Sequence, residues 1–78
     1  MDQIIHIIDF EGSPQTGVLE WGIVSIQGEN LLEAKTRLCG TKSSIDVMDS
    51  EQHGITSELV AKCLDFAHDF DLFAQLRN

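Results

Sequence analysis

The sequence has little positive charge. Its 78 residues include 5 Lys and Arg against 13 Asp and Glu, which gives a formal net charge of −8. Proteins that bind nucleic acid by simple electrostatics use Lys and Arg to neutralise phosphates, so the charge counts against that class. An acidic protein can still act on nucleic acid when divalent cations bridge its carboxylates to phosphates. The charge therefore counts much less against metal-dependent chemistry.

Cysteines and long apolar runs are also scarce. The two cysteines, Cys39 and Cys63, do not make a disulfide framework and lack the Cys-x-x-Cys spacing of a zinc site, so we expect ordinary thiols. The apolar run over residues 4–8 is interrupted by His6 and follows no basic segment, which excludes a signal peptide and a membrane span. We expect a cytoplasmic protein with reduced thiols, no membrane contact and one small domain over residues 1–78.

Three strands are predicted in the first half of the chain. The β-branched run over residues 4–8 is apolar on both faces, which is typical of a buried strand. A second strand over 18–26 is joined by a hairpin connection at 27–30 to a third strand over 32–38. The third strand alternates between two faces. We expect packing on the face of Leu32, Ala34, Thr36 and Leu38, and water on the face of Glu33, Lys35 and Arg37.

Two short helical segments are predicted after the strands. Residues 39–49 are mixed and polar, which indicates a loop. Residues 50–53 suit a single turn of helix that Gly54 stops. Thr56 is a good N-cap for a short helix over 57–63.

A final helix is predicted after Asp65, which can cap it. Its apolar stripe follows helical spacing and holds Phe66, Phe70, Phe73 and Ala74. Asp69 and Asp71 are then expected on the solvated face of this helix. The whole pattern predicts an α/β fold, with a three-stranded antiparallel sheet followed by two or three helices.

The strongest chemical signal is the pair of carboxylates Asp9 and Glu11. Residues i and i+2 of a strand point to the same side, so both carboxylates would converge at the end of the first strand. Mg²⁺ and Mn²⁺ are hard cations that prefer several oxygen ligands of this kind. The alternative is that the strand simply ends in solvated acids, and spacing alone does not decide between the two.

Four segments together resemble a known family. They are Ile-Ile-Asp-Phe-Glu-Gly at 7–12, Leu-Glu-Trp-Gly-Ile-Val at 19–24, His-Gly-Ile-Thr at 53–56, and the apolar stripe from Phe66 to Leu76. In order and spacing they resemble the DnaQ-like (DEDD-superfamily) 3′–5′ exonucleases, beginning with the first exonuclease motif. The resemblance covers nearly the whole chain.

This resemblance implies a ribonuclease-H-like fold and hydrolysis of phosphodiester bonds at the 3′ end of DNA or RNA. In the family, four acidic residues in three motifs hold two divalent ions, Mg²⁺ or Mn²⁺. Asp9 and Glu11 would be the catalytic, metal-binding residues of the first motif. Gly12, Ser13 and Phe10 would contact the terminal nucleotide. Pro14 stands where family members often have threonine and glycine.

The second and third motifs of the family are not found in these residues. We therefore expect residues 1–78 to be the N-terminal portion of an exonuclease domain, inactive or nearly so alone. Residues 67–71, Ala-His-Asp-Phe-Asp, superficially mimic the second motif. We reject that interpretation because no strand precedes them and the phenylalanines keep helical spacing through them.

A non-enzymatic alternative is an interaction module that keeps part of the exonuclease fold. Uncovered strand edges and an apolar helix stripe favour homo-oligomers, domain swapping or a partner chain. A shared active site, completed by a separate chain, would combine the two functions. These alternatives stay open at the level of sequence.

Two histidines and the aromatic side chains have plainer interpretations. His6 lies in an apolar strand and is expected to be a hydrogen-bonded core histidine. His53 suits a structural hydrogen bond or a substrate contact. Trp21 and the phenylalanines are expected in the core, not as platforms for base stacking.

Overall fold

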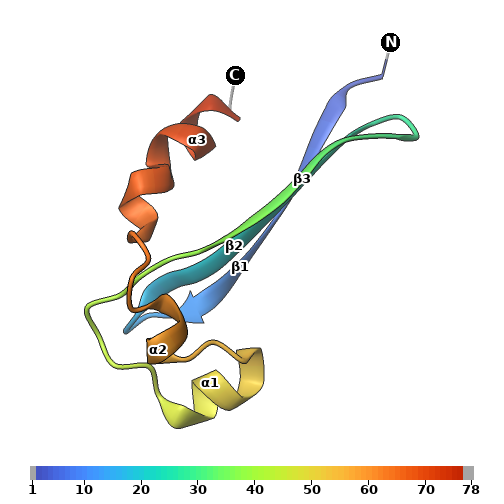
Figure 1. Cartoon of the computed structure of the whole chain (residues 1–78). Helices are drawn as coiled ribbons and strands as arrows, with labels where there is room; N and C mark the ends of the chain where they lie inside the picture. The colour runs from blue at the N-terminus through green and yellow to red at the C-terminus, as the bar shows by residue number, and fades with distance from the viewer. Residues whose placement is uncertain (1, 77–78) are drawn as a thin grey trace.

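A computed structural model describes residues 2–76 and contains one antiparallel sheet (Figure 1). Its strands are β1 (Ile4–Ser13), β2 (Gly17–Gln27) and β3 (Asn30–Leu38), in the order β1-β2-β3. Gly28 has a φ of 59° in the tight turn between β2 and β3, a backbone conformation that glycine adopts without strain. The predicted strands and hairpin are confirmed.

The helices follow the sheet in sequence. They are α1 (Val47–His53), α2 (Ser57–Val60), the 3₁₀ helix η1 (Phe66–Asp69) and α3 (Phe70–Gln75). In Figure 1, α1 and α2 lie at one end of the sheet, opposite the turn between β2 and β3. The predicted α/β class is confirmed, and no helix among residues 2–76 has the length and apolar content that crossing a membrane requires.

The ends of α1 and α2 follow from their caps. Helix α1 begins earlier than predicted, because the Asp46 carboxylate accepts a hydrogen bond from Met48 N at 2.9 Å. It ends at Gly54, whose φ is 74°, as predicted. The Thr56 hydroxyl accepts from Leu59 N at 3.2 Å, which confirms this N-cap, although α2 ends at Val60 and not at residue 63.

The last helix differs from its prediction at its first turn. Asp65 does not cap it; its carboxylate lies 3.0 Å from Nδ1 of His68. Because the first turn is a 3₁₀ helix with three residues per turn, Asp69 is turned inward and is buried, while the Phe70 ring still contacts that of Phe66 with centroids 5.3 Å apart. Phe70 is nevertheless 57% exposed, so the predicted stripe is only partly correct.

The core lies almost entirely against β2, the central strand. One cluster joins Leu19 to Ile55 and Val60, next to α1 and α2. A second cluster holds Trp21, Ile23 and Cys39. The partly buried residues that cover this second cluster are Val18, Phe66, Leu72, Phe73 and Leu76. The prediction that Trp21 is a core residue is confirmed.

The prediction that the first strand is buried is wrong. Strand β1 forms an edge of the sheet, and the exposed fractions of Ile4, Ile5, Ile7 and Ile8 are 51, 53, 55 and 38%. His6 is also exposed, not a core residue, although its Nδ1 makes a 2.7 Å hydrogen bond with the buried hydroxyl of Ser25. An apolar run on both faces indicates two-sided burial only when other elements cover the strand.

The packed face of β3 is also the reverse of the prediction along most of the strand, although Leu38, at its end, packs against the cluster of Leu19, Ile55 and Val60 as expected. Arg37 is paired with Trp21 and Lys35 with Ile23, so these two cations share the face that η1 and α3 cover. We call this the helix-side face and the opposite one the open face. Thr36 is paired with Gly22 and lies on the open face, where it is exposed.

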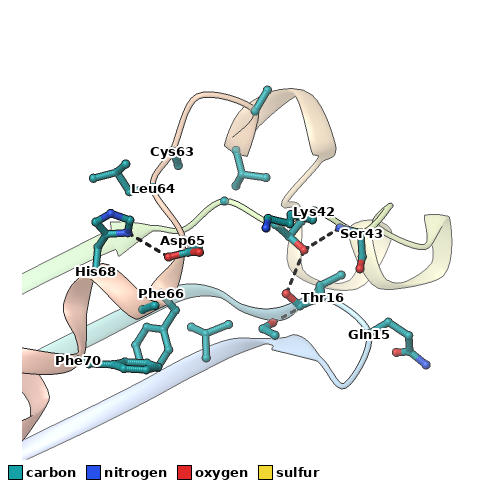
Figure 2. A pocket seen from close by; sticks show the side chains of 17 residues that line it. Gln15, Thr16, Lys42, Ser43, Cys63, Leu64, Asp65, Phe66, His68 and Phe70 are labelled. Atoms are coloured by element: carbon teal, nitrogen blue, oxygen red, sulfur yellow. Dashed lines mark hydrogen bonds and ion pairs between the residues drawn. The ribbon is translucent and has the colours of Figure 1, made fainter.

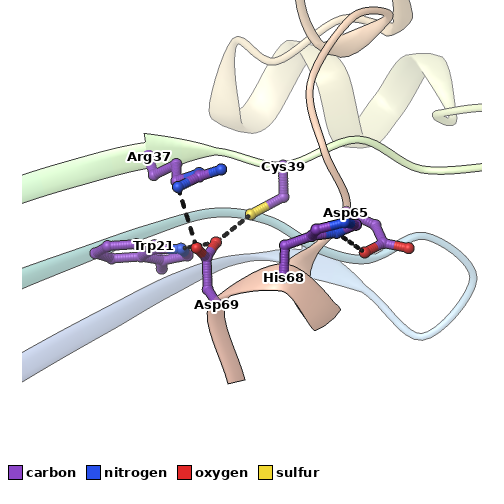
Figure 3. Close-up of polar contacts among 6 residues, drawn as sticks. All are labelled: Trp21, Arg37, Cys39, Asp65, His68 and Asp69. Atoms are coloured by element: carbon purple, nitrogen blue, oxygen red, sulfur yellow. Dashed lines mark hydrogen bonds and ion pairs between the residues drawn. The ribbon is translucent and has the colours of Figure 1, made fainter. Parts of the chain in front are cut away.

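Asp69 is buried and not solvated, which corrects a further prediction (Figure 3). Trp21 Nε1 donates to Asp69 Oδ2 at 2.8 Å, and Arg37 pairs with Oδ1 at 3.2 Å. The thiol of Cys39 also points at Oδ2. Burial and the neighbouring Asp69 charge raise the pKa of Cys39 to about 11, so this free thiol stays protonated. Asp71 is exposed, as predicted.

Candidate active site

Asp9 and Glu11 lie on the open face of β1, at the end of its isoleucine run. Asp9 is paired with Gly22 of β2, and Glu11 with Glu20. Both acids are exposed. Because Gly22 has no side chain, nothing on β2 stands directly beside the Asp9 carboxylate. The strand therefore presents two carboxylates on one accessible face, as i, i+2 spacing predicted.

These two carboxylates are the kind of ligand that a hard cation prefers, but two carboxylates are too few to complete its coordination. Mg²⁺ and Mn²⁺ prefer carboxylate oxygens, and six ligands complete the usual octahedral site. Glu20 lies opposite Glu11, yet residues 2–76 contain no group of three His, Cys, Asp or Glu placed to hold a metal. A complete two-ion site would require acids in addition to Asp9 and Glu11.

The turn after Glu11 is held by its own backbone and hydroxyls. The pairing of β1 with β2 shifts between Glu11 and Gly12, which is a β-bulge. Ser13 N donates to the Thr16 hydroxyl at 3.1 Å, and Thr16 N donates to the Ser13 hydroxyl at 3.2 Å. The Ser13 side chain thus has a role inside the turn, and its predicted nucleotide contact stays a prediction.

Gly12 has a structural reason to be glycine. Its φ is 155°, and a β-carbon there would collide with the backbone oxygen of Gly17 across the turn. We expect Gly12→Ala to lower the free energy of unfolding by about 2–3 kcal/mol, measured by urea denaturation. The matched control is Gly22→Ala, because a β-carbon at Gly22 meets only Lys35 O at 3.9 Å. Equal losses in both variants would contradict the proposed collision.

Phe10 lies between the two acids in sequence but on the helix-side face. Its ring centroid is 5.7 Å from that of Phe66 and 5.6 Å from that of Phe73. It remains 47% exposed. Its side chain therefore points away from the carboxylates and toward η1 and α3. The predicted contact of Phe10 with a nucleotide stays a prediction.

His53 makes the structural hydrogen bond that the sequence suggested. Its Nδ1 accepts from Ile55 N at 3.0 Å, just beyond the end of α1. This bond places the proton of a neutral ring on Nε2. Among the described residues, Nε2 is buried and has no hydrogen-bond partner.

A cavity with a volume of about 660 Å³ lies elsewhere (Figure 2). It is formed where the turn at Thr16 meets Lys42 and the segment that contains Asp65 and Phe66. Neither Asp9 nor Glu11 lines it. Its lining comes from three separate stretches of sequence, so no local motif could have predicted it.

The comparisons with known proteins support the fold. Neither a scan against protein-family models nor a search of curated proteins gave a match. Among solved structures, the chain is similar to Exonuclease X in complex with 5′ overhanging duplex DNA, with a TM-score of 0.76 and 22% sequence identity. The similarity covers 87% of this chain and 42% of that chain. The fold is partial ribonuclease-H-like. The chain spans less than half the length of that exonuclease.

Proposed function

We propose that residues 1–78 form the N-terminal portion of a metal-dependent 3′–5′ exonuclease domain. The intact domain would hydrolyse phosphodiester bonds at the 3′ end of DNA or RNA. The observation that supports this proposal is the position of Asp9 and Glu11, which share the open face at the end of β1. They lie there in a fold similar to that of a DNA-bound exonuclease.

Asp9 and Glu11 would hold Mg²⁺ or Mn²⁺ through their carboxylate oxygens. When bound, the two ions of such a site activate a water and stabilise the leaving oxygen. Asp9, which has Gly22 beside it, would contact both ions, as the resemblance to the exonucleases implies. Glu11 would contact one. Because two carboxylates are too few for a tight site, we expect weak metal binding and little or no hydrolysis by these residues alone.

Metal binding can be tested on this chain by nuclear magnetic resonance. We expect Mn²⁺ to broaden the backbone amide signals of Asp9 and Glu11 before those of the other acidic residues. Asp9→Asn should abolish this selectivity. Asp71→Asn changes the charge equally at an exposed position on α3 and should preserve it. Broadening that spreads over all acidic residues, or that survives Asp9→Asn, would refute the proposed site.

A further inference from the structure

The turn after Glu11 is joined to the loop that follows β3 by the side chain of Thr41. Thr41 Oγ1 donates to the backbone oxygen of Thr16 at 3.1 Å and accepts from Ser43 N at 3.1 Å, and dashed lines in Figure 2 mark both bonds. Of the hydrogen bonds within residues 2–76, the bond to Thr16 is the one that joins residues 13–16 to a segment outside β1 and β2. One hydroxyl therefore connects the turn to this loop.

Side-chain packing adds little to this connection within residues 2–76. The cavity of about 660 Å³ lies on one side of the turn, where Thr16, Thr41 and Lys42 help to line it. A second cavity, of about 520 Å³, is lined by Ser13 and Thr16 from the turn and by residues 44–46 from the loop. Because Thr16 borders both cavities, it has few van der Waals partners there, and the position of its carbonyl depends on the hydrogen bond from Thr41.

The anchored carbonyl is close to Glu11 along the backbone. Thr16 O belongs to the peptide that links Thr16 to Gly17, and Gly12 approaches Gly17 so closely that a β-carbon on Gly12 would collide with the Gly17 oxygen. The β-bulge lies between Glu11 and Gly12, and a bulge sets the direction of the side chains beside it. A displacement of Thr16 therefore reaches Glu11 through Gly17 and Gly12.

From these contacts we infer that Thr41 is a positioning residue of the proposed metal site. It holds the turn in place and thereby keeps the Glu11 carboxylate on the open face beside that of Asp9. Thr41 acts through the turn and not as a ligand. The role toward the metal rests on the proposed function, whereas the order of the turn rests on the hydrogen bonds alone.

Hydrogen exchange of the metal-free chain, followed by nuclear magnetic resonance, tests the effect on the turn. Ser13 N and Thr16 N each donate to the hydroxyl of the other residue, at 3.1 and 3.2 Å. Thr41→Val removes the hydroxyl and nearly keeps the side-chain shape. We expect it to speed exchange of these two amides about threefold, because one neutral hydrogen bond contributes a factor of this order. Thr41→Ser should restore the rates. Unchanged rates in Thr41→Val would overturn the inference whether or not the chain binds a metal.

Manganese titration tests the effect on the carboxylates. From the broadening of the Glu11 amide signal, we expect Thr41→Val to raise the apparent Mn²⁺ dissociation constant about threefold, and Thr41→Ser to leave it near that of the unmodified chain. Thr56→Val is the matched control, because it removes another threonine hydroxyl that accepts a backbone hydrogen bond, from Leu59 N at 3.2 Å. This control should lower stability and leave the titration unchanged. Equal weakening by Thr41→Val and Thr56→Val would show a general loss of stability and contradict a positioning role.

The outcomes distinguish this inference from the proposed function. If the unmodified chain shows no selective broadening at Asp9 and Glu11, the proposed metal site fails, and the role of Thr41 toward the metal fails with it. If the unmodified chain binds Mn²⁺ at these acids and Thr41→Val binds it equally well, only the positioning role is disproved.

Discussion

Asp69→Ala is expected to lower the free energy of unfolding by about 3 kcal/mol. The Asp69 side chain is 6% exposed, and it accepts from Trp21 Nε1 at 2.8 Å while pairing with Arg37 at 3.2 Å. Its removal leaves the buried indole N–H without a partner and the Arg37 guanidinium without its counter-charge. Since the Arg37 side chain is 43% exposed, water compensates part of that second loss.

Urea denaturation of three variants separates these contributions. Asp69→Asn keeps an oxygen for Trp21 and loses the ion pair, so we expect a loss of about 1–2 kcal/mol. Asp71→Asn lies two residues further on, at an exposed position, and should change stability by less than about 0.5 kcal/mol. Similar losses for Asp69→Asn and Asp71→Asn would show that general helix charge, and not the Trp21 and Arg37 contacts, explains the effect.

The buried position of Asp69 shows why local periodicity was insufficient. The spacing of Phe66, Phe70 and Phe73 matches an α-helix, and that pattern places Asp69 on the solvent-exposed face. A 3₁₀ first turn changes the angular position of each residue, so Asp69 is buried, while Phe70 stays in contact with Phe66 but is more than half exposed. The local sequence pattern does not show whether this first turn forms an α-helix or a 3₁₀ helix. In the fold, a Trp21 N–H and an Arg37 side chain lie where Asp69 can reach them.

Strand positions and helix caps were predictable because they depend on neighbours in sequence. Thr56 caps α2 with its own hydroxyl, and Gly54 ends α1 by its positive φ. Burial was not predictable in the same way. The isoleucines of β1 and the alternating residues of β3 have the right period, but which face is covered depends on where η1 and α3 pack.

The geometry of the candidate site was likewise predictable only where it depends on neighbours in sequence. Alternation in a strand places Asp9 and Glu11 together, and the same rule places Phe10 on the opposite face. The close approach of Gly12 to Gly17 could not be read from sequence, because it depends on a bulge between paired strands. The resemblance to exonucleases assigned Gly12 a nucleotide contact, whereas the fold alone already requires a glycine there.

Asp9→Asn is expected to reduce nuclease activity about a thousandfold in a protein that contains this chain together with further acidic motifs. The assay is Mn²⁺-dependent hydrolysis of a 3′-labelled single strand by the longest reading frame that includes residues 1–78. A metal ion supplies several kcal/mol of transition-state stabilisation, and loss of about 4 kcal/mol corresponds to this factor. The isolated chain should show activity near background, because Asp9 and Glu11 alone do not complete a metal site.

The controls separate chemistry from folding. Glu11→Gln removes the second carboxylate and should also be severely impaired, whereas Glu29→Gln, in the turn between β2 and β3, should retain activity. Unchanged circular dichroism of Asp9→Asn is expected, since the Asp9 side chain is exposed and, within residues 2–76, bonds only to the adjacent Phe10 N. If the longer protein has no activity and binds no Mn²⁺ at Asp9, the fold has been kept without the exonuclease chemistry.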